Sequence, residues 1–290
     1  MQTLQFLIDE LTRGRNIHIS VLDLSGITDS PYTKLELDNI VHTKKYCAIA
    51  KSASKGRPCL KCKTFANAKA VSEKEPFCGH CIYGIFEIAV PVLTNGGVCA
   101  VIYVGNAVID KEKSVEIIKR TCSRSGADEK KLVSELKNCE HIDTPEELFR
   151  IGELVKDYLL YLDKNAPKPK HEMHWLVYLM KRHADELYQT ETTLAEFAKT
   201  YQKNEKYIGR LFKQEVGMSY AEYNQRQKLI RAEEMLIKTD ERIIEIALEC
   251  GFNNISYFNR SFKKQYGTSP SEYRAKMTGV SREKRLQKNI

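Results

Sequence analysis

The sequence lacks any apolar run long enough to cross a membrane. A membrane-spanning helix needs roughly 18–20 predominantly apolar residues, and the longest candidate, from Ile82 to Leu93, is interrupted by Glu87 and Pro91. The segment from Met1 to Leu4 also lacks the basic region with which a secretory signal begins. We therefore expect a cytoplasmic protein without a membrane partner.

Patterns typical of an enzyme are also missing. The sequence has no glycine-rich loop of the phosphate-binding kind, and no cysteine lies in a recognisable pattern with a base and an acid. The chain has nine cysteines, an odd number that argues against a disulfide framework in a protein without an export signal. Metal binding, redox chemistry and burial of single thiols remain as interpretations, and we expect no catalytic residue.

Length and composition indicate two folded domains. The 290 residues are 42% apolar and 29% charged, which is typical of globular proteins. Pro167 and Pro169 prevent a helix from continuing and favour an extended spacer. We therefore predict a linker at residues 165–170, between a domain of residues 1–164 and a domain of residues 171–290. The net charge is +8, and more of the excess lies in the second domain.

The first domain has the pattern of an α+β fold. Its apolar residues have helical spacing in some segments and form β-branched runs in others. The predicted helices cover residues 4–11, 113–123, 129–138 and 144–162. The predicted strands cover residues 17–24, 87–93 and 98–104. Asn95-Gly96 lies between the last two strands and is the strongest short sequence signal for a hairpin, so we expect an antiparallel sheet at the centre.

The last of these helices, at about residues 144–163, has a marked start and an apolar stripe. Thr144 followed by Glu147 is typical of a capping box. The apolar residues recur every three or four positions and are Leu148, Ile151, Val155, Tyr158 and Leu162. Such a stripe can pair two subunits as a short coiled coil, or it can pack against its own domain. A homodimer through this helix is therefore one of two predictions.

The second domain contains an internal repeat at an offset of 50 residues. The segment from Tyr207 to Lys213 recurs as Tyr257 to Lys263, and matching Gly, Ser, Glu and Tyr residues follow in both copies. Each copy has a short helix, at residues 194–201 or 243–250, followed by a turn and a second helix. This arrangement is typical of a helix-turn-helix unit.

The second helix of each copy is amphipathic. Ile208 and Phe212, or Phe258 and Phe262, lie four positions apart and would face the core. The opposite face suits a DNA major groove, because Arg binds guanine bidentately, Asn binds adenine, and Lys and Tyr bind phosphates. The predicted DNA-contacting residues are Asn204, Lys206, Tyr207, Arg210, Lys213, Asn253, Asn254, Ser256, Tyr257, Asn259, Arg260 and Lys263. A merely solvated helix face is the alternative, but it does not account for the duplication.

These motifs resemble the AraC/XylS-type DNA-binding domain over about residues 171–275. The resemblance rests on Ile243 to Ala247, Cys250-Gly251-Phe252, Tyr257 to Lys263 and Gly267 to Arg274. It implies an all-helical domain of about seven helices that reads two successive segments of the major groove. Gln202 occupies the turn position of the first copy where a glycine is common, so we expect a strained turn there. A basic tail at residues 282–288 lies beyond the resemblance.

Four cysteines of the first domain have the spacing of a metal site. Cys59, Cys62, Cys78 and Cys81 form a C-x2-C-x15-C-x2-C pattern, which suits tetrahedral binding of zinc by thiolates. An iron–sulfur cluster uses the same ligands. Free, partly buried thiols are the alternative interpretation.

The first domain also resembles a PocR-type sensory domain over about residues 5–160. The resemblance rests on Tyr46-Cys47, the pair Cys59 and Cys62, and the segments Cys81 to Ile85, Ala89 to Pro91 and Val98 to Val108. It implies a PAS-like fold that senses small molecules, often simple alcohols or diols, although Ile82 stands where the family commonly has His. An apolar pocket would suit such a ligand. Its candidate lining residues, equally suited to a plain core, are Phe86, Ile88, Val90 and Tyr103.

The sequence thus predicts a sequence-specific, DNA-binding transcription regulator. The first hypothesis is an activator that responds to a small organic ligand, acts as a homodimer on double-stranded DNA and contacts RNA polymerase. A regulator that senses metal or redox state through the cysteine cluster is the alternative. An enzyme with a DNA-binding appendage is the third hypothesis.

Overall fold

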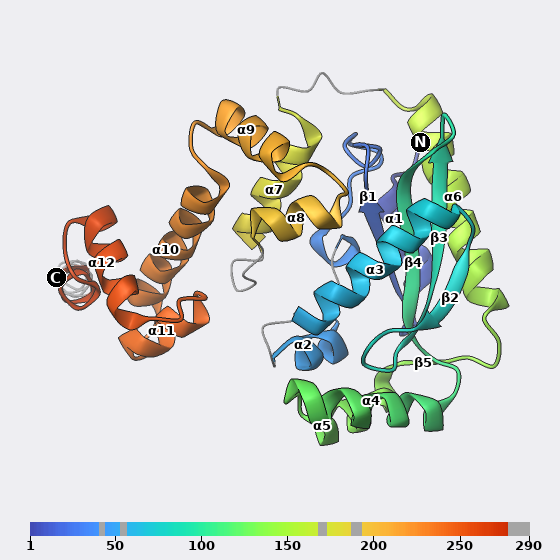
Figure 1. Ribbon diagram of the computed structural model, residues 1–290, viewed down its shortest axis with the longest axis horizontal. Helices are drawn as coiled ribbons and strands as arrows, with labels where there is room; N and C mark the ends of the chain where they lie inside the picture. The colour runs from blue at the N-terminus through green and yellow to red at the C-terminus, as the bar shows by residue number, and fades with distance from the viewer. Residues whose placement is uncertain (41–43, 53–56, 168–172, 187–192, 278–290) are drawn as a thin grey trace, which may run out of the picture. The chain divides into compact units, whose positions relative to one another are not determined.

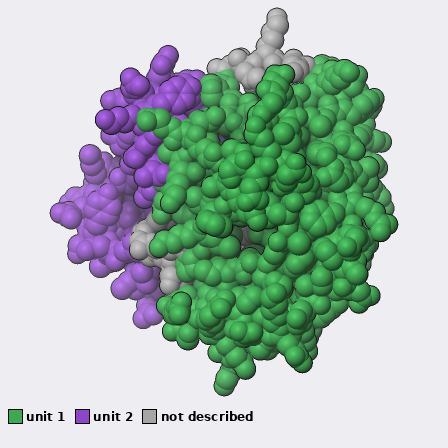
Figure 2. Space-filling model, turned by 45° about the vertical axis from the view of Figure 1, so that its right-hand side comes forward, with its two compact units in different colours: residues 1–176, 196–204 green, residues 177–195, 205–290 purple. Residues whose placement is uncertain are grey.

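The computed structural model describes residues 1–40, 44–52, 57–167, 173–186 and 193–277 (Figure 1). The chain forms two compact units, residues 1–176 with 196–204 and residues 177–195 with 205–290 (Figure 2). Residues 168–170 of the predicted linker and the whole basic tail at residues 282–288 lie outside the described residues. Within the described residues, no helix is both long and apolar enough to span a membrane.

An antiparallel sheet forms the centre of the first unit, as the sequence predicts. Its strands have the order β1-β4-β3-β2, and β5 pairs in parallel with the end of β4. The strands are β1 (His18–Asp23), β2 (Phe77–His80), β3 (Phe86–Thr94), β4 (Gly97–Val108) and β5 (Glu140–His141). Asn95 and Gly96 join β3 to β4 with φ values of 51° and 78°. These left-handed values are those of a two-residue type I′ turn, so the predicted hairpin is confirmed.

Helices cover both faces of this sheet (Figure 1). The helices of the first unit are α1 (Leu4–Thr12), η1 (Leu37–Asn39), α2 (Lys45–Ser52), α3 (Arg57–Glu73), α4 (Lys111–Ser125), α5 (Glu129–Glu135), η3 (Leu136–Asn138) and α6 (Glu146–Asn165). α6 lies so close to one face that a Cβ on Gly152 would be 2.8 Å from Val90 Cγ2. α3 covers the opposite face, where the Tyr103 hydroxyl donates a hydrogen bond to Asn67 Oδ1 at 2.5 Å.

The apolar stripe of α6 packs against its own domain. Leu148, Val155 and Leu162 are fully buried and Ile151 is nearly so, all in one cluster with the α6-facing residues of the sheet. Tyr158 packs at the edge of the same cluster. The stripe is therefore part of the domain core, and it does not form a free coiled-coil face.

The predicted start of α6 is wrong in its details. The helix begins at Glu146, and its N-cap residue Pro145 forms no side-chain cap hydrogen bond. Glu147, the expected partner of Thr144 in a capping box, instead forms an ion pair with Arg15 at 2.7 Å. Pro145 is the N-cap residue, so the helix starts about one residue later than a cap at Thr144 would place it.

The second domain is helical in the part of the chain that the structure describes. Its helices are α7 (Trp175–Glu186), α8 (Leu194–Thr200), α9 (Glu205–Val216), α10 (Tyr220–Lys238), α11 (Ile243–Glu249) and α12 (Ile255–Tyr266), followed by helical residues 270–277. The predicted all-helical fold is thus confirmed. Ser219 and Glu222 form a capping box at the start of α10, because each side chain accepts a hydrogen bond from the backbone N–H of the other.

Candidate functional site

α9 and α12 have matching buried and exposed faces. Ile208 and Phe212 of α9, like Phe258 and Phe262 of α12, are 0% exposed. All twelve predicted DNA-contacting residues are exposed, namely Asn204, Lys206, Tyr207, Arg210, Lys213, Asn253, Asn254, Ser256, Tyr257, Asn259, Arg260 and Lys263. The apolar spacing therefore identified the inward face of both helices correctly.

An aromatic cluster fixes the orientation of α12. The Phe262 ring centroid lies 5.7 Å from that of Phe258, 4.5 Å from that of Tyr266 and 5.5 Å from that of Tyr273. Phe252, which follows the turn, lies 5.0 Å from Phe258. Offset and edge-on aromatic pairs of this kind are favourable beyond the apolar area that they bury. Because the rings hold one side of α12 against the core, the polar side faces outward.

The two asparagines before α12 differ in their roles. Asn254 is the N-cap residue, and its Oδ1 accepts a hydrogen bond from the Tyr257 backbone N–H at 2.9 Å. This contact satisfies one of the unpaired N–H groups at the helix start. Asn254 therefore has a structural role that the sequence did not assign to it, whereas Asn253 precedes the cap and is exposed.

The turns before α9 and α12 share one backbone geometry. In the first copy, the Lys203 N–H donates to Ala198 O at 2.9 Å, and Gln202 has a φ of 53°. In the second copy, the Phe252 N–H donates to Ala247 O at 2.9 Å, and Gly251 has a φ of 76°. This is the Schellman arrangement, which needs a left-handed residue. Gln202 adopts that conformation with a side chain attached, as the sequence predicts for a strained turn.

A polar cluster lies between α3 and the sheet in the first unit. Lys63 Nζ lies 3.3 Å from Glu87 Oε2 and 3.0 Å from the centroid of the Tyr103 ring. The Tyr103 hydroxyl donates to Asn67 Oδ1 at 2.5 Å, and Asn67 is 1% exposed. Burial lowers the pKa of Lys63, a shift that the neighbouring Glu87 opposes. Burial also raises the pKa of Tyr103, so its hydroxyl stays protonated and can donate.

The sheet separates Cys78 from the other three cysteines of the predicted metal site. Cys59 and Cys62 lie on α3, whereas Cys78 of β2 is paired with Ile88, whose side chain packs under α6. Paired residues of antiparallel strands point to the same face, so Cys78 lies on the face away from α3. Cys81 follows β2 and is half-buried. Among the described residues, no group of three or more His, Cys, Asp or Glu side chains is placed to hold a metal ion.

The thiols on the α3 side are held in their protonated form. Burial raises the pKa of Cys59 to about 12 and the pKa of Cys81 well above its ordinary value. Burial likewise raises the pKa of Cys47 and of Cys62. A protonated thiol is a poor nucleophile, so these cysteines resemble packed thiols more than reactive ones.

The four residues predicted to line a ligand pocket do not share one face of the sheet. Phe86, Ile88 and Val90 belong to the core beneath α6. Tyr103 pairs with Ala89 across the hairpin and therefore points to the α3 side. Only Tyr103 thus joins the polar cluster. The reason is the two-residue periodicity of a strand, which places alternate side chains on opposite faces.

Sequence reasoning missed three members of the polar cluster, Lys63, Asn67 and Glu87. Two signals were available. Lys63 and Asn67 lie four positions apart, so they share one face of a helix. Glu87 is a charged residue between Phe86 and Ile88 in a strand that is otherwise apolar. A charge in such a strand must have a partner or lie at a functional site.

Comparisons with known proteins match both halves of the chain. Residues 1–162 match the sensory domain found in PocR, and residues 197–276 match a helix-turn-helix domain. A stretch of 67 residues is 36% identical to the HTH-type transcriptional activator RhaR of Mannheimia succiniciproducens, covering 23% of this chain and 24% of that protein. A stretch of 101 residues is 33% identical to the uncharacterized HTH-type transcriptional regulator YfiF of Bacillus subtilis, covering 34% and 32%. The chain thus spans about a quarter to a third of these relatives.

A solved structure is similar to the same part of the chain. The C-terminal domain of AraT, a response regulator from Geobacillus stearothermophilus, is 29% identical and has a TM-score of 0.35. The match covers 37% of this chain and 88% of that one.

Proposed function

Because this chain belongs to the AraC-type transcription regulators that carry a PocR sensory domain, we propose that α9 and α12 read two successive major-groove segments and that a small ligand controls this binding. The chain is a DNA-binding transcription regulator rather than an enzyme. The observation that carries the proposal is the duplicated polar face of α9 and α12, each set over a buried apolar pair.

The length of the helix between the two copies supports the proposal that α9 and α12 bind successive segments of the major groove. α10 has 19 residues, which corresponds to a length of about 28 Å at the rise of an α-helix. Successive major-groove segments on one face of DNA are roughly 34 Å apart. A continuous helix of this length is a suitable spacer for two recognition helices on one duplex.

Removal of one arginine from each recognition helix tests the proposed DNA contacts. The full chain would first select a binding site from random DNA, and binding of that site would then be measured for Arg210→Ala and Arg260→Ala. We expect each change to weaken binding about 5- to 150-fold, equivalent to roughly 1–3 kcal/mol, and to relax selectivity at one base position. Lys238→Ala is the control, because it removes an exposed positive charge from α10. If both arginine variants bind like the wild type, the assignment of the helices is wrong.

The proposed ligand site is the polar cluster of Lys63, Asn67, Glu87 and Tyr103. Asn67 Nδ2 is buried and has no hydrogen-bond partner among the described residues. An unpaired buried N–H costs roughly 1–3 kcal/mol, and the oxygen of a ligand hydroxyl would satisfy it. The hydroxyl hydrogen can in turn be donated to the Glu87 carboxylate. This pairing of one donor and one acceptor favours a simple alcohol or diol.

A thermal-shift measurement on the full chain tests this ligand class. Propane-1,2-diol should raise the melting temperature of the wild type and of the control variant Tyr158→Phe. The Tyr158 hydroxyl of the wild type donates a hydrogen bond to a backbone carbonyl oxygen far from the cluster. The shift should be lost in Asn67→Leu and reduced in Tyr103→Phe. An equal shift in all four proteins would show that the diol acts elsewhere or without a specific site.

The remaining partners follow from the proposed role as an activator. Such a protein would contact RNA polymerase, and transcription in vitro from a template with the selected site would measure its effect. A homodimer would have to use a surface other than the apolar stripe of α6, because that stripe is buried. Sedimentation of the full chain with and without DNA would measure its oligomeric state.

A further inference from the structure

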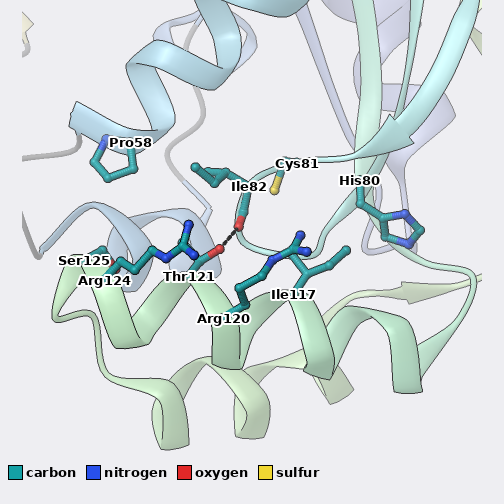
Figure 3. A pocket seen from close by; sticks show the side chains of 9 residues that line it. All are labelled: Pro58, His80, Cys81, Ile82, Ile117, Arg120, Thr121, Arg124 and Ser125. Atoms are coloured by element: carbon teal, nitrogen blue, oxygen red, sulfur yellow. Dashed lines mark hydrogen bonds between the residues drawn. The ribbon is translucent and has the colours of Figure 1, made fainter.

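A pocket lies between α4 and the segment after β2 in the first unit. It has a volume of about 560 Å³, which is within the usual range for small-molecule sites. Its lining residues are Pro58, His80, Cys81, Ile82, Ile117, Arg120, Thr121, Arg124 and Ser125 (Figure 3). None of Lys63, Asn67, Glu87 and Tyr103 is among them, so this pocket is distinct from the polar cluster.

The charged groups of the pocket are all positive. Arg120 and Arg124 lie one turn apart on α4, and both side chains extend toward the segment after β2 (Figure 3). Neither arginine forms an ion pair with a carboxylate of the described residues, and no Asp or Glu lines the pocket. Both arginines are exposed. Two adjacent guanidinium groups without an acidic partner suit a carboxylate or phosphate, because each can donate two parallel hydrogen bonds.

The start of α3 adds to this positive potential. Pro58 lies in the first turn of α3 and lines the pocket. The N-terminal end of a helix carries a partial positive charge, and the first turn of α3 contains no acidic residue that would offset it. The helix end and the two arginines therefore both favour a negatively charged ligand.

Part of the remaining wall is apolar, and it is held in place by a hydrogen bond. Ile82 and Ile117 lie beside the arginines. The Thr121 hydroxyl donates a hydrogen bond to the Ile82 carbonyl oxygen at 2.6 Å, which fixes the segment after β2 against α4 (Figure 3). Apolar walls next to paired arginines suit a ligand that has a charged head and a short hydrocarbon tail.

We propose that this pocket binds a small organic carboxylate with a short aliphatic tail, through Arg120 and Arg124 at its head and Ile82 and Ile117 along its tail. The sensory domain would then carry two ligand sites of different chemistry. The polar cluster under α3 accepts an uncharged hydroxyl compound, and the pocket at α4 accepts an anion.

Titration calorimetry on the full chain without DNA tests the proposal. The probes are butyrate, inorganic phosphate and butan-1-ol, and the proteins are the wild type, Arg120→Gln/Arg124→Gln and Lys119→Gln. We expect butyrate to bind the wild type and Lys119→Gln equally and the double variant at least about tenfold more weakly, since two charge-assisted hydrogen-bonded contacts are lost. Lys119 is exposed on α4 and does not line the pocket, so it controls for loss of charge.

The other probes identify which part of the ligand matters. Butan-1-ol should bind at least about tenfold more weakly than butyrate, because it lacks the charged head. Phosphate should bind more weakly than butyrate, because it cannot use the apolar wall, and Ile117→Ser should weaken butyrate while leaving phosphate unchanged. The proposal would be overturned if the double variant bound butyrate as tightly as the wild type does. It would also be overturned if the wild type bound phosphate or butan-1-ol more tightly than butyrate. Propane-1,2-diol should still raise the melting temperature of the double variant. That result would show that the polar cluster and the pocket at α4 are separate sites.

Discussion

The turns of the two helix-turn-helix copies allow the cost of one left-handed side chain to be measured. Gln202 and Gly251 occupy equivalent positions, with φ values of 53° and 76° and the same pattern of backbone hydrogen bonds. A residue with a Cβ pays about 1–2 kcal/mol to adopt this conformation, whereas glycine adopts it freely. The two copies therefore carry a natural comparison between a strained turn and a relaxed one.

Three substitutions separate the strain from other effects. Gln202→Gly should be more stable than Gln202→Ala by about 0.5–1 kcal/mol. Glycine removes the left-handed penalty of about 1–2 kcal/mol. It also costs roughly 0.4–1 kcal/mol, because it gives the unfolded chain more conformational freedom, and the figure is the difference between the two. Gln202→Ala is the matched control, because it removes the same amide but keeps the Cβ. Gly251→Ala should lower stability by a similar amount, since it introduces the penalty into the second copy.

Scanning calorimetry of the full chain measures these differences, because it follows the transition of each folding unit. For a domain of about 100 residues, 1 kcal/mol corresponds to roughly 4–8 °C in melting temperature. If Gln202→Gly melts no higher than Gln202→Ala, the turn of the first copy is not strained. If Gly251→Ala melts like the wild type, the left-handed geometry of the second turn has no energetic importance.

Three further outcomes are expected. Gly152→Val should destabilise the sensory domain by roughly 1–3 kcal/mol in urea denaturation, because the new side chain would overlap Val90; an unchanged midpoint would mean that α6 can move away from the sheet. The pKa of Glu222 lies below its ordinary value of 4.5 because Ser219 hydrogen-bonds to the carboxylate. Its stabilising contribution is therefore present above pH 4.5 and lost as the pH falls through the lowered pKa. Glu222→Gln should accordingly melt lower than the wild type at pH 7 and approach it in acid, and a constant gap would mean that the ionised carboxylate does not stabilise the helix start. Elemental analysis of protein purified without oxygen should find zinc and iron well below one per chain, whereas a stoichiometric metal that is lost in Cys59→Ser would revive the metal-sensing alternative.

The sequence predicted the DNA-binding domain in more detail than the sensory domain, and the reason is the range of the interactions involved. Helix caps, left-handed turns and apolar residues four positions apart are all local features. The left-handed Gln202 and the buried pair Phe258 and Phe262 therefore lie where their patterns predict. Because the unit is duplicated, the same pattern of apolar and polar residues occurs twice and supports the prediction independently in each copy. Only the N-cap role of Asn254 was missed, because an asparagine at that position suits both a cap and a base contact.

The sequence alone determined that an α+β domain precedes an all-helical one, and it determined the antiparallel hairpin at Asn95-Gly96 and the inward faces of the recognition helices. Tertiary structure alone decided which side chains of the sensory domain share a site. The alternation of the strands sends Tyr103 to the face under α3 and Ile88 to the face under α6. The same alternation places Cys78 apart from Cys59, although their spacing in the chain suits one metal ion. A site assembled from two faces and several elements depends on long-range packing, which a linear pattern of residues does not specify.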